Sequence, residues 1–262
     1  MPRLAVNLST LFTDAPFLDR FERAAKAGFD AVEFQFAYAF EPAEIAARLS
    51  ETGLTLALFN MPAGDWEHGD RGLAARPARR DEFRTGVGQA IDLALELGCK
   101  RLHMLAGIVA PDDDEDALRQ TYVDNLRYAA QFCGTAGIEV LIEPISRESF
   151  PAYFLSGLDM AADLIDEAGE ENVFLQYDLY HRRFVGEDLV SPYLRHADRI
   201  RHVQVAGWPG RHEPDVGVLD WPAAFAALDA ANYAGVVGCE YFPAGRTEDG
   251  LGWARPWLGE PS

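Results

Sequence analysis

The chain has 262 residues, of which 48% are hydrophobic and 25% are charged, and its formal net charge is −19 at pH 7. This composition is typical of a folded globular protein and argues against a disordered, collagenous or coiled-coil chain. The excess of acid argues against binding to nucleic acid or to an anionic membrane surface through bulk charge, because both of these partners are negatively charged.

Three features of the sequence bear on where the protein works. No apolar run approaches the roughly 20 residues that a membrane-spanning helix needs. The first ten residues show no charged-then-apolar leader. The three cysteines, Cys99, Cys133 and Cys239, are odd in number and far apart, which favours a reducing compartment over a disulfide framework. We therefore expect a cytoplasmic protein.

Short apolar segments recur along the whole chain, and each is interpreted as a strand. Most are uninterrupted apolar runs, as expected of parallel strands that are buried on both faces. The eight predicted strands are Arg3–Leu8, Ala31–Phe36, Leu54–Phe59, Arg101–Leu105, Glu139–Glu143, Val173–Asp178, Ile200–Val205 and Val236–Glu240.

Segments with helical periodicity separate these strands. The first predicted helix follows Asp14, has Pro16 near its first turn and ends at Gly28. The acidic run at 112–116 is predicted to begin a helix, because carboxylates there interact favourably with the helix dipole. The other predicted helices are Pro42–Leu49, Glu82–Leu97, Glu115–Ala136, Leu158–Ala168, Asp188–Ala197, Trp221–Ala230 and Gly250–Trp257.

The alternation of strands and helices predicts an α/β protein with the (β/α)₈ TIM-barrel fold, formed by one domain over residues 1–262. Eight strands in a chain of this length give one βα unit per roughly 33 residues, as in barrels of about 250 residues. A doubly wound open sheet is the alternative, but it usually has fewer strands, and no G-x-G-x-x-G follows the first predicted strand. The longest predicted loop, at about residues 60–80, follows a strand and is of the kind that covers active sites.

Four side chains with oxygen donors stand where apolar strands finish: Glu143, Asp178, Gln204 and Glu240. They are spaced by about one βα unit each, so they come from four successive strands and are expected to converge at the carboxyl-terminal mouth of a barrel. Three crowded carboxylates repel one another unless a cation neutralises them, and an all-oxygen set suits Mg²⁺ or Mn²⁺. The alternative is that four unrelated strand-end residues meet solvent.

Beyond this pattern, a set of motifs resembles the hydroxypyruvate isomerase family, within the xylose isomerase-like barrels, over nearly the whole chain. Each motif alone is weak, and together they are specific. They are N-L-S-T-L-F at 7–12, G-F-D-A-V-E-F-Q-F at 28–36, N-M-P-A-G-D-W-E-H-G-D-R-G at 60–72, N-L-R-Y-A-A at 125–130, L-I-E-P-I at 141–145, Q-Y-D-L-Y-H at 176–181, H-V-Q-V-A at 202–206 and G-C-E-Y at 238–241.

The resemblance implies roles for named residues. Glu143 and Glu240 correspond to the acid/base pair, and the same two glutamates with Asp178 and Gln204 correspond to the site of a divalent metal, Mg²⁺ or Mn²⁺. Gln204 takes a place that is histidine in many relatives. His181 and Arg211 match substrate-contacting positions of related sugar epimerases. The metal need not be strictly required, because a carboxylate pair with an arginine can also move a proton.

A small keto acid carries a carboxylate of its own, so an acidic protein must supply local positive charge to hold it. The candidates are His68 and Arg71, in the loop at 64–72, together with Arg211. For Arg71 the alternative is a salt bridge to Asp65 or Asp70. For Arg211 it is pairing with Glu213, and for His181 it is a buried histidine bonded to backbone.

The leading expectation is an aldose–ketose isomerase that converts hydroxypyruvate to 2-hydroxy-3-oxopropanoate (tartronate semialdehyde) by enediolate proton transfer between the two glutamates. A 2-oxo-tetronate isomerase and a ketose 3-epimerase with the same site are the alternatives, ahead of a non-catalytic sugar-binding barrel. Trp208 departs from the pattern of relatives, and as part of the pocket wall it is expected to influence which substrate fits more than the chemistry. The expected partner is a small-molecule substrate, and neither nucleic acid nor a membrane is expected to bind. Whether the protein forms a homo-oligomer is left open by the sequence.

Overall fold

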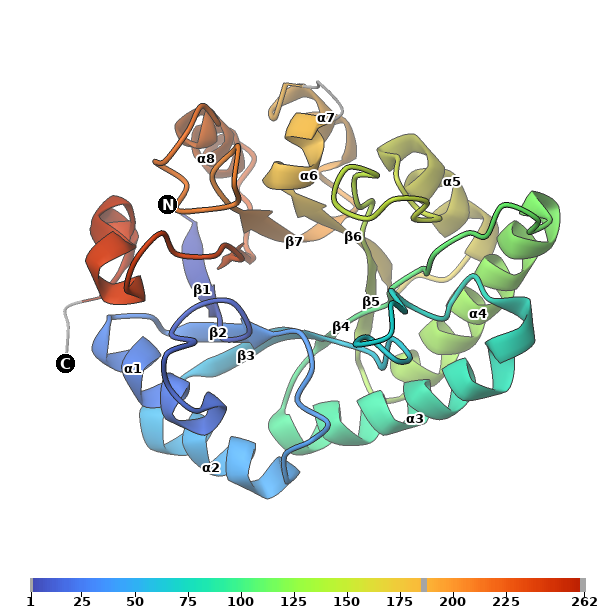
Figure 1. The fold of residues 1–262 in the computed structure, drawn as a ribbon, viewed down its shortest axis with the longest axis horizontal. Coiled ribbons are helices and arrows are strands. Elements are labelled where there is room, and N and C mark those ends of the chain that lie inside the picture. The colour runs from blue at the N-terminus through green and yellow to red at the C-terminus, as the bar shows by residue number, and fades with distance from the viewer. Residues whose placement is uncertain (1, 185–187, 260–262) are drawn as a thin grey trace. The chain divides into compact units, whose positions relative to one another are not determined.

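The structure is a computed structural model that describes residues 2–184 and 188–259. Its eight strands follow one another in chain order, β1 to β8, with the topology of a closed barrel, and helices alternate with them (Figure 1). The predicted (β/α)₈ fold is therefore confirmed. By its internal packing the chain forms two compact units, Met1–Phe59 with Tyr177–Ser262, and Asn60–Gln176. That residues 1–262 act as one domain stays a prediction.

The first unit combines both ends of the chain in one parallel sheet. Its strands are β1 (Arg3–Asn7), β2 (Ala31–Phe34), most of β3 (Thr55–Asn60), β7 (Ile200–Val205) and β8 (Val236–Cys239). They pair in the order β7–β8–β1–β2–β3, so that β1 lies between β8 and β2. Its helices are η1 (Phe17–Asp19), α1 (Arg20–Lys26), α2 (Pro42–Thr52), α6 (Leu179–Phe184), α7 (Ser191–His196), α8 (Trp221–Ala230) and η3 (Thr247–Trp257).

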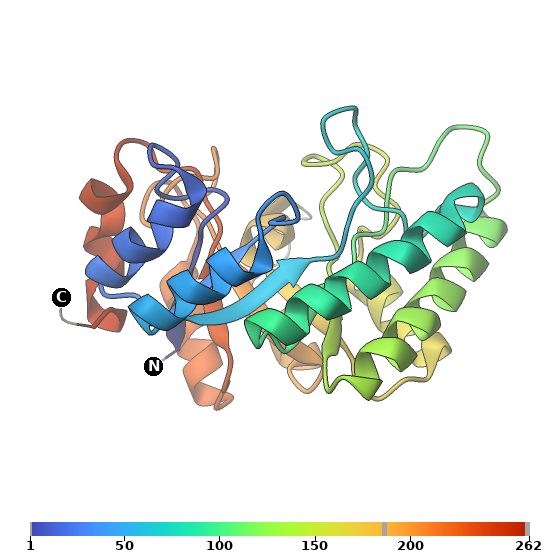
Figure 2. The same cartoon turned by 90° about the horizontal axis from the view of Figure 1, so that it is seen from below.

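The second unit is one continuous segment of the chain. In it β5 (Glu139–Ile142) pairs in parallel with β4 (Arg101–His103) and with β6 (Val173–Asp178). Its helices are η2 (Pro77–Arg79), α3 (Arg80–Leu97), α4 (Glu115–Thr135) and α5 (Leu158–Ala168). Helices α3 and α4 lie side by side (Figures 1 and 2).

Most predicted elements agree with the structure to within a few residues. The acidic run does begin a helix, because the Asp114 side chain caps α4 by accepting hydrogen bonds from the backbone N–H groups of Asp116 and Ala117. The helix predicted from Asp188 begins only at Ser191, since Asp188 accepts from the N–H groups of Val190 and Ser191 in a turn before it. The prediction missed α6 altogether, and the last helix is a 3₁₀ segment.

The core consists of apolar side chains from the strands and the inner faces of the helices, as the uninterrupted apolar runs predicted. All four residues of β2 are buried, as are all four of β8. The three cysteines are buried and free. No helix in the described part of the chain is long and apolar enough to cross a membrane.

Candidate active site

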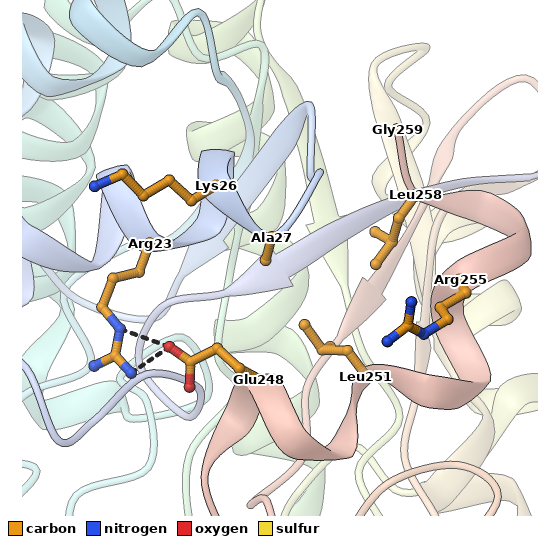
Figure 3. A pocket seen from close by; sticks show the side chains of 8 residues that line it. All are labelled: Arg23, Lys26, Ala27, Glu248, Leu251, Arg255, Leu258 and Gly259. Atoms are coloured by element: carbon orange, nitrogen blue, oxygen red, sulfur yellow. Dashed lines mark hydrogen bonds and ion pairs between the residues drawn. The ribbon is translucent and has the colours of Figure 1, made fainter. Parts of the chain in front are cut away.

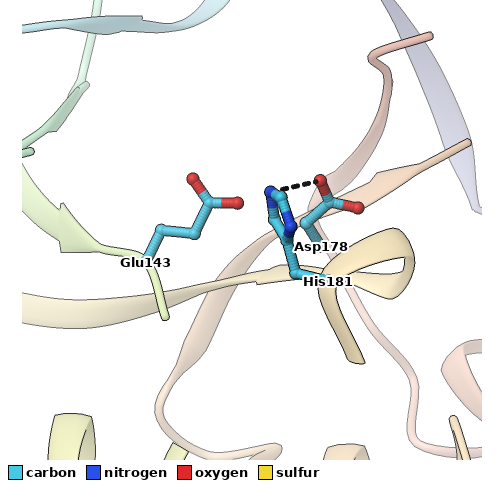
Figure 4. A group of neighbouring side chains, drawn as sticks. All are labelled: Glu143, Asp178 and His181. Carbon is cyan, nitrogen blue, oxygen red and sulfur yellow. Dashed lines mark ion pairs between the residues drawn. The ribbon is translucent and has the colours of Figure 1, made fainter. Parts of the chain in front are cut away.

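Asp178 is the last residue of β6, and its side chain organises the turn that follows. It accepts a hydrogen bond from the backbone N–H of Tyr180 (2.8 Å), which caps the short helix α6. That helix brings His181 back toward the strand end, where its Nε2 lies 3.5 Å from Asp178 Oδ2 (Figure 4). Both side chains are buried. The predicted spacing of three residues between them therefore produces a real contact.

Arg211, in the loop after β7, joins Asp178 to the end of β8. Its Nη2 lies 3.1 Å from Asp178 Oδ2 and 2.6 Å from Glu240 Oε2, and its Nε donates to the backbone carbonyl of Glu240 (3.2 Å). The guanidinium also lies over the ring of Tyr180, 5.0 Å from its centre. Arg211 therefore pairs with two of the three predicted site carboxylates, and the alternative partner Glu213 instead accepts from the N–H of Ala244.

Backbone hydrogen bonds hold the loop that carries Arg211 in place. Arg211 has φ +57°, a left-handed backbone conformation that residues other than glycine seldom adopt. Its carbonyl accepts from the N–H of Phe242 (2.8 Å), and the carbonyl of His212 accepts from Gly207 (2.8 Å). These contacts hold the backbone from which the Arg211 side chain starts.

Burial and charge together shift the proton affinity of the two carboxyl groups. Desolvation, opposed by Arg211 and reinforced by Asp178 and Glu33, raises the pKa of Glu240 to about 7. Desolvation also raises the pKa of Asp178, and Arg211 and the N–H of Tyr180 act in the opposite direction. A glutamate that titrates near neutrality can both take up and release a proton, as general acid/base chemistry requires.

Gln204 lies in β7 and turns its side chain toward β2. Its Nε2 donates to Glu33 Oε1 (2.8 Å), and both side chains are buried. Gln35, just after β2, donates to Glu240 Oε1 (2.9 Å). Sequence reasoning singled out neither Glu33 nor Gln35. The available signal was an acidic residue inside the otherwise apolar strand A-V-E-F.

Glu143, also drawn in Figure 4, directly follows β5 in the second unit. It is buried and accepts a hydrogen bond from Gln176 Nε2 in β6 (3.1 Å). His103 Nε2, from β4, lies 3.7 Å from its Oε2. Residues from β4 and β6 therefore contact this carboxyl group at the end of β5.

The two substrate-binding residues predicted in the loop after β3, His68 and Arg71, differ in their surroundings. The His68 side chain is 81% exposed and its Nδ1 lies 2.8 Å from Asp65 Oδ2. Arg71 is half-buried, donates to the carbonyls of Trp66 (2.9 Å) and Asp70 (2.6 Å), and stacks 4.2 Å from the centre of a Trp66 ring. Its contacts are thus with backbone and aromatic rings rather than with the carboxylates of Asp65 or Asp70.

By their chemistry, the oxygen donors of the first unit are of the kind that a divalent cation binds. Asp178 and Glu240 are both buried, and oxygens of both lie within 3.1 Å of the same guanidinium nitrogen, so they converge on one point of positive charge. The Gln204 carboxamide turns its nitrogen toward Glu33, which leaves the end with the oxygen facing away from it. Carboxylates with a carboxamide oxygen form the donor set that Mg²⁺ and Mn²⁺ prefer.

A separate cavity of about 470 Å³ lies between α1 and η3 (Figure 3). Its Arg23 is already bonded to Glu248 and to Asp14, and Lys26 pairs with Glu22. None of the residues predicted for the site lines it. The lining residues are Arg23, Lys26, Ala27, Glu248, Leu251, Arg255, Leu258 and Gly259.

Comparison with known proteins gives close matches over the whole chain. The family model described as xylose isomerase-like TIM barrel matches residues 21–257. The 2-oxo-tetronate isomerase of Cupriavidus necator is 46% identical, covering 99% of this chain and 100% of the relative. The hydroxypyruvate isomerase of Escherichia coli is 41% identical, covering 98% and 100%. A crystal structure from Brucella melitensis, named AP endonuclease, family 2, is 44% identical with a TM-score of 0.96, covering 98% and 100%.

Proposed function

This chain belongs to the xylose isomerase-like TIM barrel family and is an isomerase, and we propose that its substrate is a short 3-hydroxy-2-oxo acid. The relatives named as isomerases support this substrate class, because they are similar over the full length. The name of the Brucella protein would suggest a nucleic-acid substrate instead. A formal net charge of −19 opposes that alternative, since DNA binding depends on neutralising phosphates with basic residues.

Within this class, a four-carbon acid is the first choice. The relatives at 46% and 43% identity are both named 2-oxo-tetronate isomerase, and the one at 41% is named hydroxypyruvate isomerase. Both substrates have a carbonyl at carbon 2 and a hydroxyl at carbon 3. The same proton transfer between these two carbons therefore serves either acid, and the size of the pocket selects between them.

The observation that carries the proposal is the cluster of Asp178, Glu240 and Arg211. A glutamate whose pKa is raised to about 7 is suited to remove a proton from carbon and return it. The guanidinium beside it is suited to stabilise a developing oxyanion or to hold the carboxylate of the substrate. Glu143, buried at the end of β5, is proposed as the second acid/base group.

We write the reaction as two proton transfers at carbon and one between the two oxygens. One glutamate carboxylate takes the proton from carbon 3, and the electron pair of that C–H bond forms a C=C bond to carbon 2 as the carbonyl oxygen becomes an oxyanion. The other glutamate, in its acid form, then protonates carbon 2, while the proton of the hydroxyl on carbon 3 passes to the oxygen on carbon 2. No atoms are gained or lost, and the carbonyl ends on carbon 3.

A divalent ion, Mg²⁺ or Mn²⁺, is proposed to be held by Glu143, Asp178, Gln204 and Glu240. When bound it would polarise the carbonyl and hydroxyl oxygens of the substrate. Arg211 and His181 are proposed to bind the substrate, together with His68 and Arg71 from the loop after β3.

The test is NMR of the wild-type protein with hydroxypyruvate and with 2-oxo-tetronate in deuterated buffer, with and without EDTA. We expect a product in which carbonyl and hydroxyl have exchanged carbons, with deuterium at the newly protonated carbon. An inverted stereocentre on an unchanged ketose would instead indicate an epimerase. Binding of either acid without exchange or product would contradict catalysis, and full activity in EDTA would contradict the proposed metal.

A further inference from the structure

Glu33 is a buried carboxyl group in β2 to which the proposed chemistry assigns no role. Its side chain is 1% exposed. Asn7 Nδ2 (3.0 Å) and Gln204 Nε2 (2.8 Å) both donate to its Oε1, and His202 Nε2 lies 2.7 Å from its Oε2. A carboxyl group buried with three such partners is strongly fixed in position.

The strand pairing shows why Glu33 can reach Gln204. The two residues lie in β2 and β7, which are separated by β1 and β8 in the sheet. In β8 the residue paired with Gln204 is Gly238, and a Cβ atom there would lie 2.3 Å from Glu33 Oε2 and 2.6 Å from its Oε1. The carboxylate therefore occupies the space that any larger residue at 238 would fill.

The contact determines which end of the Gln204 carboxamide faces which way. The NH₂ group of Gln204 donates to Glu33 Oε1, so the carbonyl oxygen at the other end of the carboxamide faces away from Glu33. Removal of Glu33 removes this hydrogen bond and with it this constraint on the orientation of the carboxamide. An NH₂ group turned toward a cation could not act as its ligand, whereas the carbonyl oxygen can.

We propose that Glu33 is a positioning residue that presents the oxygen of Gln204 to the proposed divalent cation. The inference rests on the proposed function, in which Gln204 is one of the ligands. Residues that orient metal ligands typically change metal affinity by 10- to 100-fold when they are replaced. Glu33 would act in that way through one hydrogen bond.

The experiment is a double-mutant cycle on Mn²⁺ affinity, measured by isothermal titration calorimetry on Glu33→Gln, Gln204→Ala and the double variant. We expect Glu33→Gln to weaken Mn²⁺ binding by roughly 10- to 100-fold and to add little in the Gln204→Ala background. Losses that add in the double variant would show that Glu33 acts by its charge or by folding, and would overturn the inference.

Two further variants separate positioning from general damage. Glu33→Asp keeps the charge but shortens the reach, so it should weaken Mn²⁺ binding as Glu33→Gln does, and it replaces Glu33→Gln in the cycle should that variant not fold. Asn7→Ala removes another donor from the same carboxylate oxygen and should weaken binding less. An equal loss in Asn7→Ala would indicate disturbance of the whole cluster and contradict a specific role.

Failure of the proposed function would look different. If the wild-type protein bound no Mn²⁺, the proposed metal site and this inference would both be wrong. If it bound Mn²⁺ and isomerised a hydroxy-keto acid while the cycle was additive, only the inference would be wrong. Thermal unfolding of each variant records any loss of fold separately from metal affinity.

Discussion

Glu240 and Glu143 occupy corresponding places, each directly after a barrel strand, but their partners differ in kind. Glu240 contacts a guanidinium, with the carboxylate of Asp178 on the same nitrogen. Glu143 contacts the carboxamide of Gln176 and the imidazole of His103. Burial first, and then the balance of nearby charge, governs the proton affinity of Glu240, whereas these two contacts of Glu143 are with a carboxamide and an imidazole. Equivalent positions in a repeated fold thus acquire different chemistry from their neighbours.

The largest expected effect comes from removing either carboxylate. Glu240→Gln and Glu143→Gln should each lower kcat on the preferred hydroxy-keto acid by about 10²- to 10⁴-fold, because a positioned acid or base contributes that much. Steady-state kinetics would measure the change. The matched control is Glu139→Gln, at the opposite end of β5 from Glu143, where the glutamate pairs with Arg101. If either site variant stayed within about tenfold of the wild type, its assignment as an acid/base group would be wrong.

A smaller effect is expected on stability when the cation of the Glu240 cluster is removed. Arg211→Met leaves Asp178 and Glu240 without their shared guanidinium, so the free energy of unfolding near pH 8 should fall by about 3 kcal/mol. Denaturant unfolding would measure it. Combining Arg211→Met with Glu240→Gln should restore part of the loss, because one of the unpaired charges is then gone. Equal stability of wild type and Arg211→Met would contradict a structural role for this ion pair.

The smallest expected effect is a pH dependence of stability that follows from the raised pKa of Glu240. Since the pKa of Glu240 is raised from 4.5 to about 7, the folded protein holds this proton more tightly than the unfolded chain does. The stability that this proton contributes is present at low pH and is lost as the pH rises through 7. Relative to Glu240→Gln, the wild type should therefore lose unfolding free energy between about pH 4.5 and 7, by on the order of 1 kcal/mol per pH unit.

The measurement is denaturant unfolding in EDTA at several values of pH. Glu139→Gln again serves as the control and should run parallel to the wild type. A constant difference between wild type and Glu240→Gln across this range would mean that burial does not raise the pKa of Glu240 in solution.

The sequence was sufficient to predict the strands and the residues at their ends. A polar residue such as Asp178 at the end of an apolar run is visible along the chain itself, and the spacing of such residues places them in successive strands. The short helix α6 was missed because its six residues follow an apolar strand without a change in periodicity. Only the structure shows that the Asp178 side chain caps this helix.

Contacts between distant strands and loops could not be predicted from one sequence. Glu33 is visible as an acid in an apolar strand, but its partners Asn7 and Gln204 come from other strands, and pairing between them depends on the register of the sheet. The stacking of Arg71 on Phe150 joins the loop after β3 to the loop after β5. Loop conformations of this kind depend on side-chain packing rather than on local pattern.

The pairing of β1 with β8 has a consequence for synthesis on the ribosome. Arg3 pairs with Val236, so the earliest strand to emerge must wait for nearly the whole chain before that edge is satisfied. Until then its N–H and C=O groups on one side are open to pairing with another nascent chain. A premature stop before Val236 would make this open edge permanent, and such a fragment should aggregate even though most of its strands are intact.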